Sequence, residues 1–266
     1  MLTRLSSPAL AVVVVAVMFG TTGAGILLGR WLRHRREGIK EPLGVIQAAL
    51  VGFVALLLAF GLTMAVGRYE ARRAALVEEA NAIGTTYLRA QTLAEPMRSE
   101  SLKLLRDYTD QRIELSRSVP DSRKFDRAEQ RSTQIQEQLW KLAGDALNRT
   151  PTYSAPRLYV ETLNETIDDD TARVAALDNR IPAPVLWLQI AASALAVGVL
   201  GMYLASHDRG VLMAFLAATL VTVMLLVFFD LDRPHRGTIT IPDAVLVQLR
   251  ESMDRAPVAS GPTEGQ

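Results

Sequence analysis

The sequence predicts an all-α polytopic membrane protein, with four transmembrane helices and a soluble helical-bundle insert between the second and the third. Two observations carry this prediction: four long stretches without charge, and a charged block of helical periodicity between the second and third stretches. Apolar residues make up 49% of the 266 residues, which is ordinary for a globular protein. Their segregation into blocks is therefore the informative feature.

Each uncharged stretch is long enough to cross a bilayer, because about 20 helical residues span a hydrocarbon core of ~30 Å. The four stretches are residues 9–29, 43–67, 183–205 and 211–229. None shows the alternation that a barrel strand requires. The first stretch resembles a cleaved signal, but its 21 residues exceed the usual apolar region of about 7–15 residues, so we expect a retained helix.

The expected organisation follows from these stretches. Helices 1 and 2 occupy residues 1–67, the soluble insert 68–182, and a transmembrane hairpin of helices 3 and 4 residues 183–230. A juxtamembrane amphipathic segment then covers 231–252, and a tail rich in Pro, Gly and Ser, expected to be disordered, covers 253–266.

The insert contains 18 basic and 19 acidic residues and no convincing strand. Apolar residues recur in it every three or four positions, which is typical of packed amphipathic helices. The first helix is expected to extend straight out of the second span and to end by Pro96, and the second helix is expected to end near Pro120. Asp121 or Ser122 is placed to cap the third helix. The expected buried positions are Leu76, Ala80, Ile83 and Tyr87; Leu105, Tyr108 and Arg112 or Ile113; Phe125, Ala128, Ser132, Ile135, Leu139, Leu142 and Ala146; and Val160, Leu163, Ile167, Asp170, Val174, Leu177 and Ile181.

Asp170 falls at one of the positions where an apolar residue is expected. Two interpretations are open. The helix seam is wetted or shifted at this point, or the acid is buried beside an arginine or faces an aqueous path. A buried unpaired carboxylate is costly, so the second interpretation requires a partner.

The second span has a face of small residues, and this face is a candidate pore lining. In a ring of subunits this face could line a narrow pore, and in a bundle it could let helices approach closely. Gln47, the one amide in the span, could contact water or an ion, or bond across helices. The candidates are Gln47, Ala48, Gly52, Ala55, Ala59 and Thr63.

A second polar group lies on the helix that leaves this span. Asn81, Thr85 and Arg89 share one face at intervals of four residues, where they could contact an anion. The alternative is an interhelical polar network with Asn164 and Asp168 of the fourth insert helix.

Charge also gathers where the fourth span ends. Asp230 and Asp232 are expected to pair with Arg233, Arg236 or juxtamembrane arginines of other spans, while Pro234 ends the helix and Gly237 allows a turn. We interpret Asp230, Asp232 and Arg233 as a charge collar that fixes this junction, with an ion site as the alternative. A short extended piece and an amphipathic helix capped by Asp243 are expected to follow.

Other classes of protein find no support in the sequence. The net charge of +1 gives no reason to expect nucleic acid as a partner. Cysteine chemistry is excluded because the chain has no cysteine, and His34, His207 and His235 lie far apart. No phosphate loop, nucleophile elbow or metal-ligand spacing occurs, so we expect no enzyme, no cofactor and no metal site.

Three segments together resemble the bacterial bestrophin-like domain family, a domain of unknown function. They are LLLAFGLTMAVGRYEARRAALVEEANAIGTTYLRA (56–90), LNETIDDDTARVAALDNRIP (163–182) and DLDRPHRGTITI (230–241). The resemblance implies a polytopic membrane protein distantly similar to bestrophins, which are pentameric anion channels. The chain departs from true bestrophins by lacking both their acidic calcium clasp, which needs about six to eight oxygens, and their aromatic neck.

Two functions are therefore considered. The first is a homo-oligomeric channel for inorganic anions, and the alternative is a non-conducting membrane scaffold or sensor whose insert binds a partner. The expected location is the cell membrane, with the lipid bilayer and further copies of the chain as partners. Five Lys/Arg in the loop at 30–42 favour a cytoplasmic loop and hence an external insert, whereas arginines flanking the other side of the spans argue against this.

Overall fold

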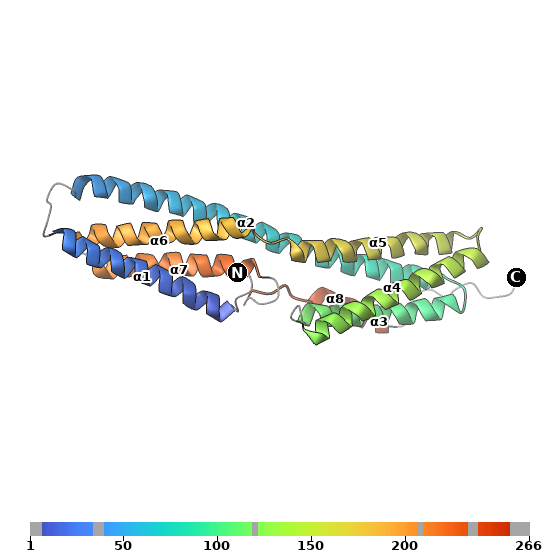
Figure 1. Ribbon diagram of the computed structural model, residues 1–266. Coiled ribbons are helices and arrows are strands. Elements are labelled where there is room, and N and C mark those ends of the chain that lie inside the picture. The colour runs from blue at the N-terminus through green and yellow to red at the C-terminus, as the bar shows by residue number, and fades with distance from the viewer. Residues whose placement is uncertain (1–6, 34–39, 119–121, 207–209, 234–238, 256–266) are drawn as a thin grey trace. The chain divides into compact units, whose positions relative to one another are not determined.

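A computed structural model describes residues 7–33, 40–118, 122–206, 210–233 and 239–255 (Figure 1). These ranges form helices and connecting segments and contain no strand. The helices are α1 (Ser7–Arg33), α2 (Lys40–Ala90), α3 (Met97–Arg117), α4 (Arg123–Arg149), α5 (Ser154–Asp178), α6 (Ala183–Ser206), α7 (Val211–Leu231) and α8 (Ala244–Asp254). The predicted all-helical class is confirmed for this part of the chain.

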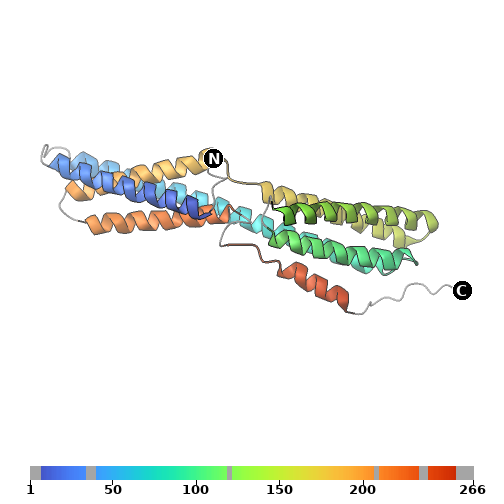
Figure 2. The same cartoon turned by 60° about the horizontal axis from the view of Figure 1, so that its bottom comes forward.

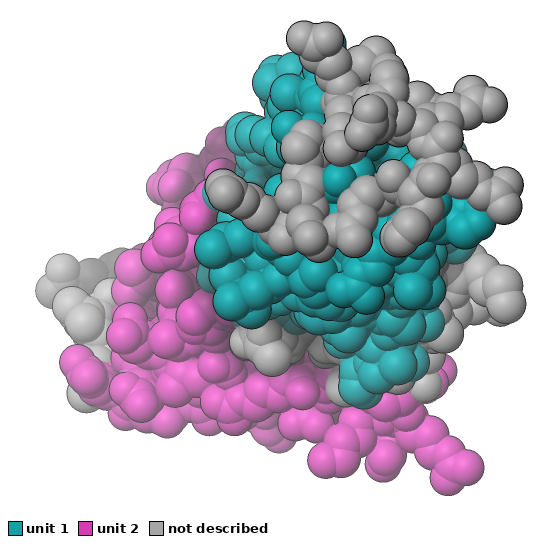
Figure 3. All heavy atoms as spheres, turned by 90° about the vertical axis from the view of Figure 1, so that its left-hand side faces the viewer, with its two compact units in different colours: residues 1–69, 180–239 teal, residues 70–179, 240–266 magenta. Residues whose placement is uncertain are grey.

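The chain divides into two compact units, coloured separately in Figure 3. Unit 1 consists of residues 1–69 and 180–239, and unit 2 of residues 70–179 and 240–266. Each unit has a hydrophobic core of its own. Both units are therefore assembled from segments that are distant in the sequence.

Unit 1 contains the helices that are apolar enough to cross a membrane. Four such helical stretches occur among the described residues, within Pro8–Leu32, Leu43–Ala90, Ser154–Ser206 and Val211–Leu231. In unit 1, α1, the first part of α2, α6 and α7 run beside one another (Figures 1 and 2). The prediction of four apolar spans is confirmed.

Glycines allow α1 and α6 to pack backbone against backbone. A Cβ atom placed on Gly25 would lie 2.0 Å from the carbonyl oxygen of Gly198, and one on Gly29 would lie 2.3 Å from that of Met202. In the reverse direction, a Cβ on Gly201 would lie 2.8 Å from the Thr22 carbonyl oxygen. Small residues permit such close approach between membrane helices.

α2 is a single helix of 51 residues that contributes to both units. The expectation that it runs straight out of the second span is confirmed. It ends at Ala90, before Pro96, and Thr92 and Leu93 close the last turn by donating their backbone N–H groups to the Arg89 and Ala90 carbonyls. Pro96 instead stands at the N-cap position of α3.

α4 begins where the sequence predicts a cap. The Ser122 hydroxyl accepts a hydrogen bond from the Phe125 backbone N–H at 3.2 Å, which satisfies one of the free donors of the first turn. The alternative cap, Asp121, lies outside the described residues. The predicted seam is buried at Ala128, Ser132, Ile135, Leu139 and Ala146.

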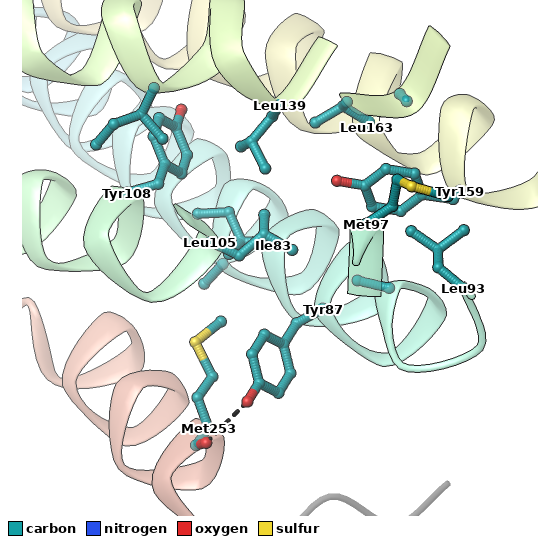
Figure 4. Packing of buried hydrophobic residues seen from close by; sticks show 14 of the residues in the cluster. Ile83, Tyr87, Leu93, Met97, Leu105, Tyr108, Leu139, Tyr159, Leu163 and Met253 are labelled. Carbon is teal, nitrogen blue, oxygen red and sulfur yellow. Dashed lines mark hydrogen bonds between the residues drawn. The ribbon is translucent and has the colours of Figure 1, made fainter. Parts of the chain in front are cut away.

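The C-terminal helix α8 completes the core of unit 2. Leu246 and Met253 are buried, and the Tyr87 hydroxyl donates to the Met253 carbonyl oxygen at 2.9 Å (Figure 4). Arg106 Nη2 donates to the same carbonyl at 3.0 Å. Gly84 lets α8 lie close, since a Cβ there would meet the Leu249 side chain at 3.1 Å.

The predicted cap of α8 was wrong in one respect. Asp243 occupies the N-cap position, but its side chain makes no capping hydrogen bond. Its carboxylate instead pairs with Arg117 Nε of α3 at 2.6 Å. An ion pair to a neighbouring helix thus replaces the local cap.

The predicted seam of α5 was wrong at one position. Val174, expected inside, is 43% exposed, whereas its neighbour Arg173 is buried. The buried residues of α5 are Pro156, Tyr159, Thr162, Leu163, Thr166 and Arg173. Of the other predicted positions in α5, Leu163 is buried and Val160, Ile167, Asp170 and Leu177 are half-buried, so the apolar rhythm misplaced Val174 alone.

Candidate functional site

The small-residue face of α2 points away from the rest of its own chain. Ala48, Gly52, Ala55, Ala59 and Thr63 are all exposed, and Gln47 is half-buried. A Cβ on Gly52 would meet no atom within 4 Å. Within the single chain this face therefore packs against no other helix, and both uses considered for it, pore lining and close approach to a further helix, need another molecule.

The opposite side of α2 is anchored to α6. Val54, Leu58, Gly61 and Ala65 are buried there. Gln189 of α6, itself buried, donates its Nε2 hydrogen bond to the Leu57 carbonyl at 3.2 Å. A Cβ on Gly61 would overlap this amide, so the glycine makes room for it. Sequence reasoning named Gln47 and missed Gln189, although both are amides within apolar spans.

A membrane-level groove adjoins the exposed face. It has a volume of about 330 Å³ and is lined only by apolar residues of α2, α6 and α7, among them Ala55, Leu58, Val197 and Leu220. Ala55 therefore borders this groove as well as lying on the small-residue face.

The second predicted polar group divides into separate pairs. On α2, the Thr85 hydroxyl donates to the Asn81 carbonyl oxygen at 2.9 Å, and on α5, Asn164 Nδ2 donates to Asp168 Oδ2 at 2.9 Å. All four residues are exposed. Of the five predicted residues, Arg89 alone bridges the two helices, by donating to the Leu158 carbonyl at 2.9 Å and lying 3.7 Å from Glu161.

The charge collar binds backbone groups. Asp232 is buried and accepts the Ile181 N–H at 3.0 Å, while Asp230 accepts the Ile239 N–H at 2.8 Å. These bonds fasten the end of α7 to the segments that enter α6 and leave α7. Arg233 and Asp230 also line a pocket of about 440 Å³ with residues of α1 and α7. Pro234, Arg236 and Gly237 lie outside the described residues.

Unit 2 contains a buried network of charges that sequence reasoning missed. Glu79 of α2 is completely buried between Arg112 of α3 and Arg173 of α5, and its two carboxylate oxygens pair with one arginine each. Arg112 also pairs with Asp170 Oδ1 of α5 at 2.5 Å. Two acids and two arginines from three helices thus neutralise one another.

Neutral side chains extend the network. Gln136 Nε2 of α4 donates to Asp170 Oδ2 at 2.8 Å and to the Tyr108 hydroxyl at 3.0 Å. Arg173 Nη2 donates to the Ser116 hydroxyl at 2.6 Å. The network therefore joins α2, α3, α4 and α5. Of the two interpretations of Asp170, the structure shows the acid paired with an arginine.

The charges stabilise one another despite burial. Desolvation opposes the positive charge of Arg112, but the negative charges of Glu79 and Asp170 outweigh it and raise the pKa of Arg112 above its ordinary value. Burial raises the pKa of the Tyr108 hydroxyl, so this group stays protonated. The sequence signalled Asp170, which interrupted an apolar seam, and Arg112, which fell at an expected buried position, whereas it gave no sign that Glu79 and Arg173 are buried.

No metal centre accompanies these charges. In the described ranges, no group of three or more His, Asp or Glu side chains could hold a metal ion. The network can fix helices in place, and the α2 face can meet another molecule.

Four apolar spans, with an exposed small-residue face on one of them, define a multi-pass membrane protein. The sequence model of the bestrophin-like domain matches residues 9–246, so the chain belongs to the bestrophin-like domain family. No curated protein matches the sequence.

Solved structures of a bacterial bestrophin homolog from Klebsiella pneumoniae have a similar fold. One has a TM-score of 0.67 at 12% identity and covers 88% of this chain and 96% of that chain. A point variant of that homolog has a TM-score of 0.68 at 13% identity and covers 90% and 96%. At such low identity the similarity concerns the fold.

Proposed function

We propose that this protein forms a homo-oligomeric ion channel in the cell membrane, with copies of α2 lining the pore. The observation that carries the proposal is the exposure of Ala48, Gly52, Ala55, Ala59 and Thr63. In a ring of subunits, this face would bring small side chains and one hydroxyl to a narrow central passage.

The same side of α2 continues beyond the small residues. At 100° per residue, Asn81 and Thr85 fall within about 60° of the direction of Gly52. Both are exposed and polar. They are therefore kept as candidate ion contacts in this proposal.

Inorganic anions are the proposed permeant ions. This part of the proposal rests on the resemblance to bestrophins and not on a positive ring in the spans. Unit 2, with its charged surface, is proposed to lie in water beside the membrane. The competing function, a non-conducting scaffold or sensor, shares the fold but needs no aqueous path along α2.

Conductance of the purified protein in planar bilayers tests the proposal. Because the chain has no cysteine, Ala55→Cys introduces a single thiol. A charged, water-soluble thiol reagent should block the current of this variant and leave that of Phe53→Cys unchanged, since Phe53 is exposed on a different flank of α2. Reversal potentials in a salt gradient report the ion.

Absence of current would support the scaffold, and block of both variants would argue against the assigned pore face. Electron microscopy of the detergent-solubilised protein provides a separate test, because a monomer or a dimer contradicts a central pore formed by a ring.

A further inference from the structure

Two patterns on α5 favour different rotations of this helix. Its apolar residues, including Val160, Ile167 and Val174, point in a direction about 60° from that of the residues actually buried, taking 100° per residue. Val160 and Ile167 are only half-buried, and Val174 is 43% exposed. Hydrophobic burial alone therefore favours an α5 turned so that Val174 lies inside.

The buried face of α5 carries the core residues Tyr159 and Leu163, and it is also held by polar contacts. Asp170 and Arg173 enter the charge network through Arg112 and Glu79. One to two turns earlier, the Thr86 hydroxyl of α2 donates to the Thr162 carbonyl at 2.8 Å and lies 2.9 Å from the Thr166 hydroxyl. Turning α5 by one-sixth of a turn would break these contacts and leave Glu79 buried beside one arginine fewer.

Buried ion pairs are weak sources of stability, because desolvation offsets their attraction, but some fix one arrangement of helices against others. Here the competing arrangement is the rotation of α5 that would bury Val174. We propose that the network of Glu79, Arg112, Asp170 and Arg173 sets the rotation of α5 and excludes the rotation that its apolar periodicity favours. This role is independent of ion conduction.

The thiol reactivity of single cysteines in the full-length protein in detergent tests the proposal. The Val174→Cys thiol should react readily with a maleimide, and the Thr162→Cys thiol should react slowly. Both are then placed in a background in which the network is replaced by apolar residues: Glu79→Leu, Arg112→Met, Asp170→Leu and Arg173→Met.

In this background we expect the Val174→Cys rate to fall at least tenfold and the Thr162→Cys rate to rise by a similar factor. A matched control removes the surface ion pair between Arg89 of α2 and Glu161 of α5 by the changes Arg89→Gln and Glu161→Gln. The control should leave both rates unchanged.

If the fourfold variant does not fold, Arg112→Met with Asp170→Leu decides. This double variant removes the Arg112–Asp170 ion pair and leaves Glu79 paired with Arg173. It should reduce the maleimide reaction rate of the Val174→Cys thiol at least threefold. Unchanged rates in a folded variant of either kind, judged by helical circular dichroism and elution volume, overturn the proposal.

Discussion

Glu79 is the residue on which the polar interior of unit 2 depends. It has no exposed surface, and its carboxylate pairs with both arginines of the network. Asp170, the other acid, pairs with Arg112 alone. Removing one member of such a network leaves uncompensated charge in the interior, which is more costly than removing the whole network.

We therefore predict that Glu79→Leu lowers the stability of the protein by about 3–5 kcal/mol. The expected result is a large decrease in melting temperature, followed by circular dichroism in detergent. An exposed acid of α4 provides the control, since Glu137→Gln should leave the melting temperature nearly unchanged. A Glu79→Leu protein as stable as the parent contradicts the burial of paired charge described here.

Asp169 illustrates the opposite situation, in which acids crowd together. Desolvation and the charges of Glu78, Glu165 and other acids raise the pKa of Asp169. A carboxyl whose pKa is higher in the folded state than in the unfolded state destabilises the fold above the unfolded pKa. This penalty disappears as the pH falls through the folded pKa.

Asp169→Asn is therefore predicted to raise the melting temperature at pH 7, and the gain should largely disappear at about pH 3, which lies below the ordinary pKa of 3.8 and hence also below the raised pKa of the folded protein. Melting curves at both pH values measure this. Asp168→Asn is the comparison, because Asp168 accepts a hydrogen bond from Asn164 and should show no gain. An equal gain at both pH values would exclude charge as the cause.

At the scale of the elements, the pairing of α1 with α6 depends on where glycine stands. Gly25 lies against the Gly198 carbonyl, whereas a Cβ on Gly20 or Gly23, in the same helix, would meet nothing within 4 Å. Helix propensity favours alanine over glycine at all three positions. Only the contact with α6 distinguishes them.

Gly25→Ala should therefore destabilise unit 1 by about 1–3 kcal/mol, because the two backbones must separate. Gly20→Ala and Gly23→Ala should be neutral or slightly stabilising. Loss of the monodisperse elution peak after heating in detergent provides the measurement. Equal effects at the three glycines would show that α1 and α6 do not approach as closely as described.

The same elements show how far sequence reasoning extends. Length and apolarity were sufficient for the four spans, and a serine before an amphipathic run was sufficient for the cap of α4. In α5 the predicted seam failed at Val174, because periodicity counts apolar residues alone, whereas the neighbouring Arg173 is buried through its partners on other helices. Gly25 and Gln189 were missed because their role exists only once α6 is placed.

At the scale of the whole molecule, unit 2 is completed by a segment that follows unit 1 in the chain. α8 adds Leu246 and Met253 to a core otherwise built from α2 to α5. Its last turn binds Tyr87 (Figure 4) and also Arg106. Removing α8 uncovers this apolar surface and leaves the Tyr87 hydroxyl without its carbonyl acceptor.

Truncation before Ala244 is accordingly predicted to lower the melting temperature and to increase the binding of a dye that reports exposed apolar surface. Arg250→Ala, which removes surface contacts of α8 with Asp110 and within the helix, is the matched control and should have a small effect. A truncated protein with the melting curve of the parent would show that α8 adds nothing to the core.

The late position of α8 has a consequence for biosynthesis. The ribosome produces α2 to α5 well before α8, and the two apolar helices α6 and α7 are made in between. The core of unit 2 therefore lacks the side chains of α8 during the synthesis and membrane insertion of α6 and α7. Its folding can finish only after the last span has been delivered to the membrane, which ties the maturation of one unit to the insertion of the other.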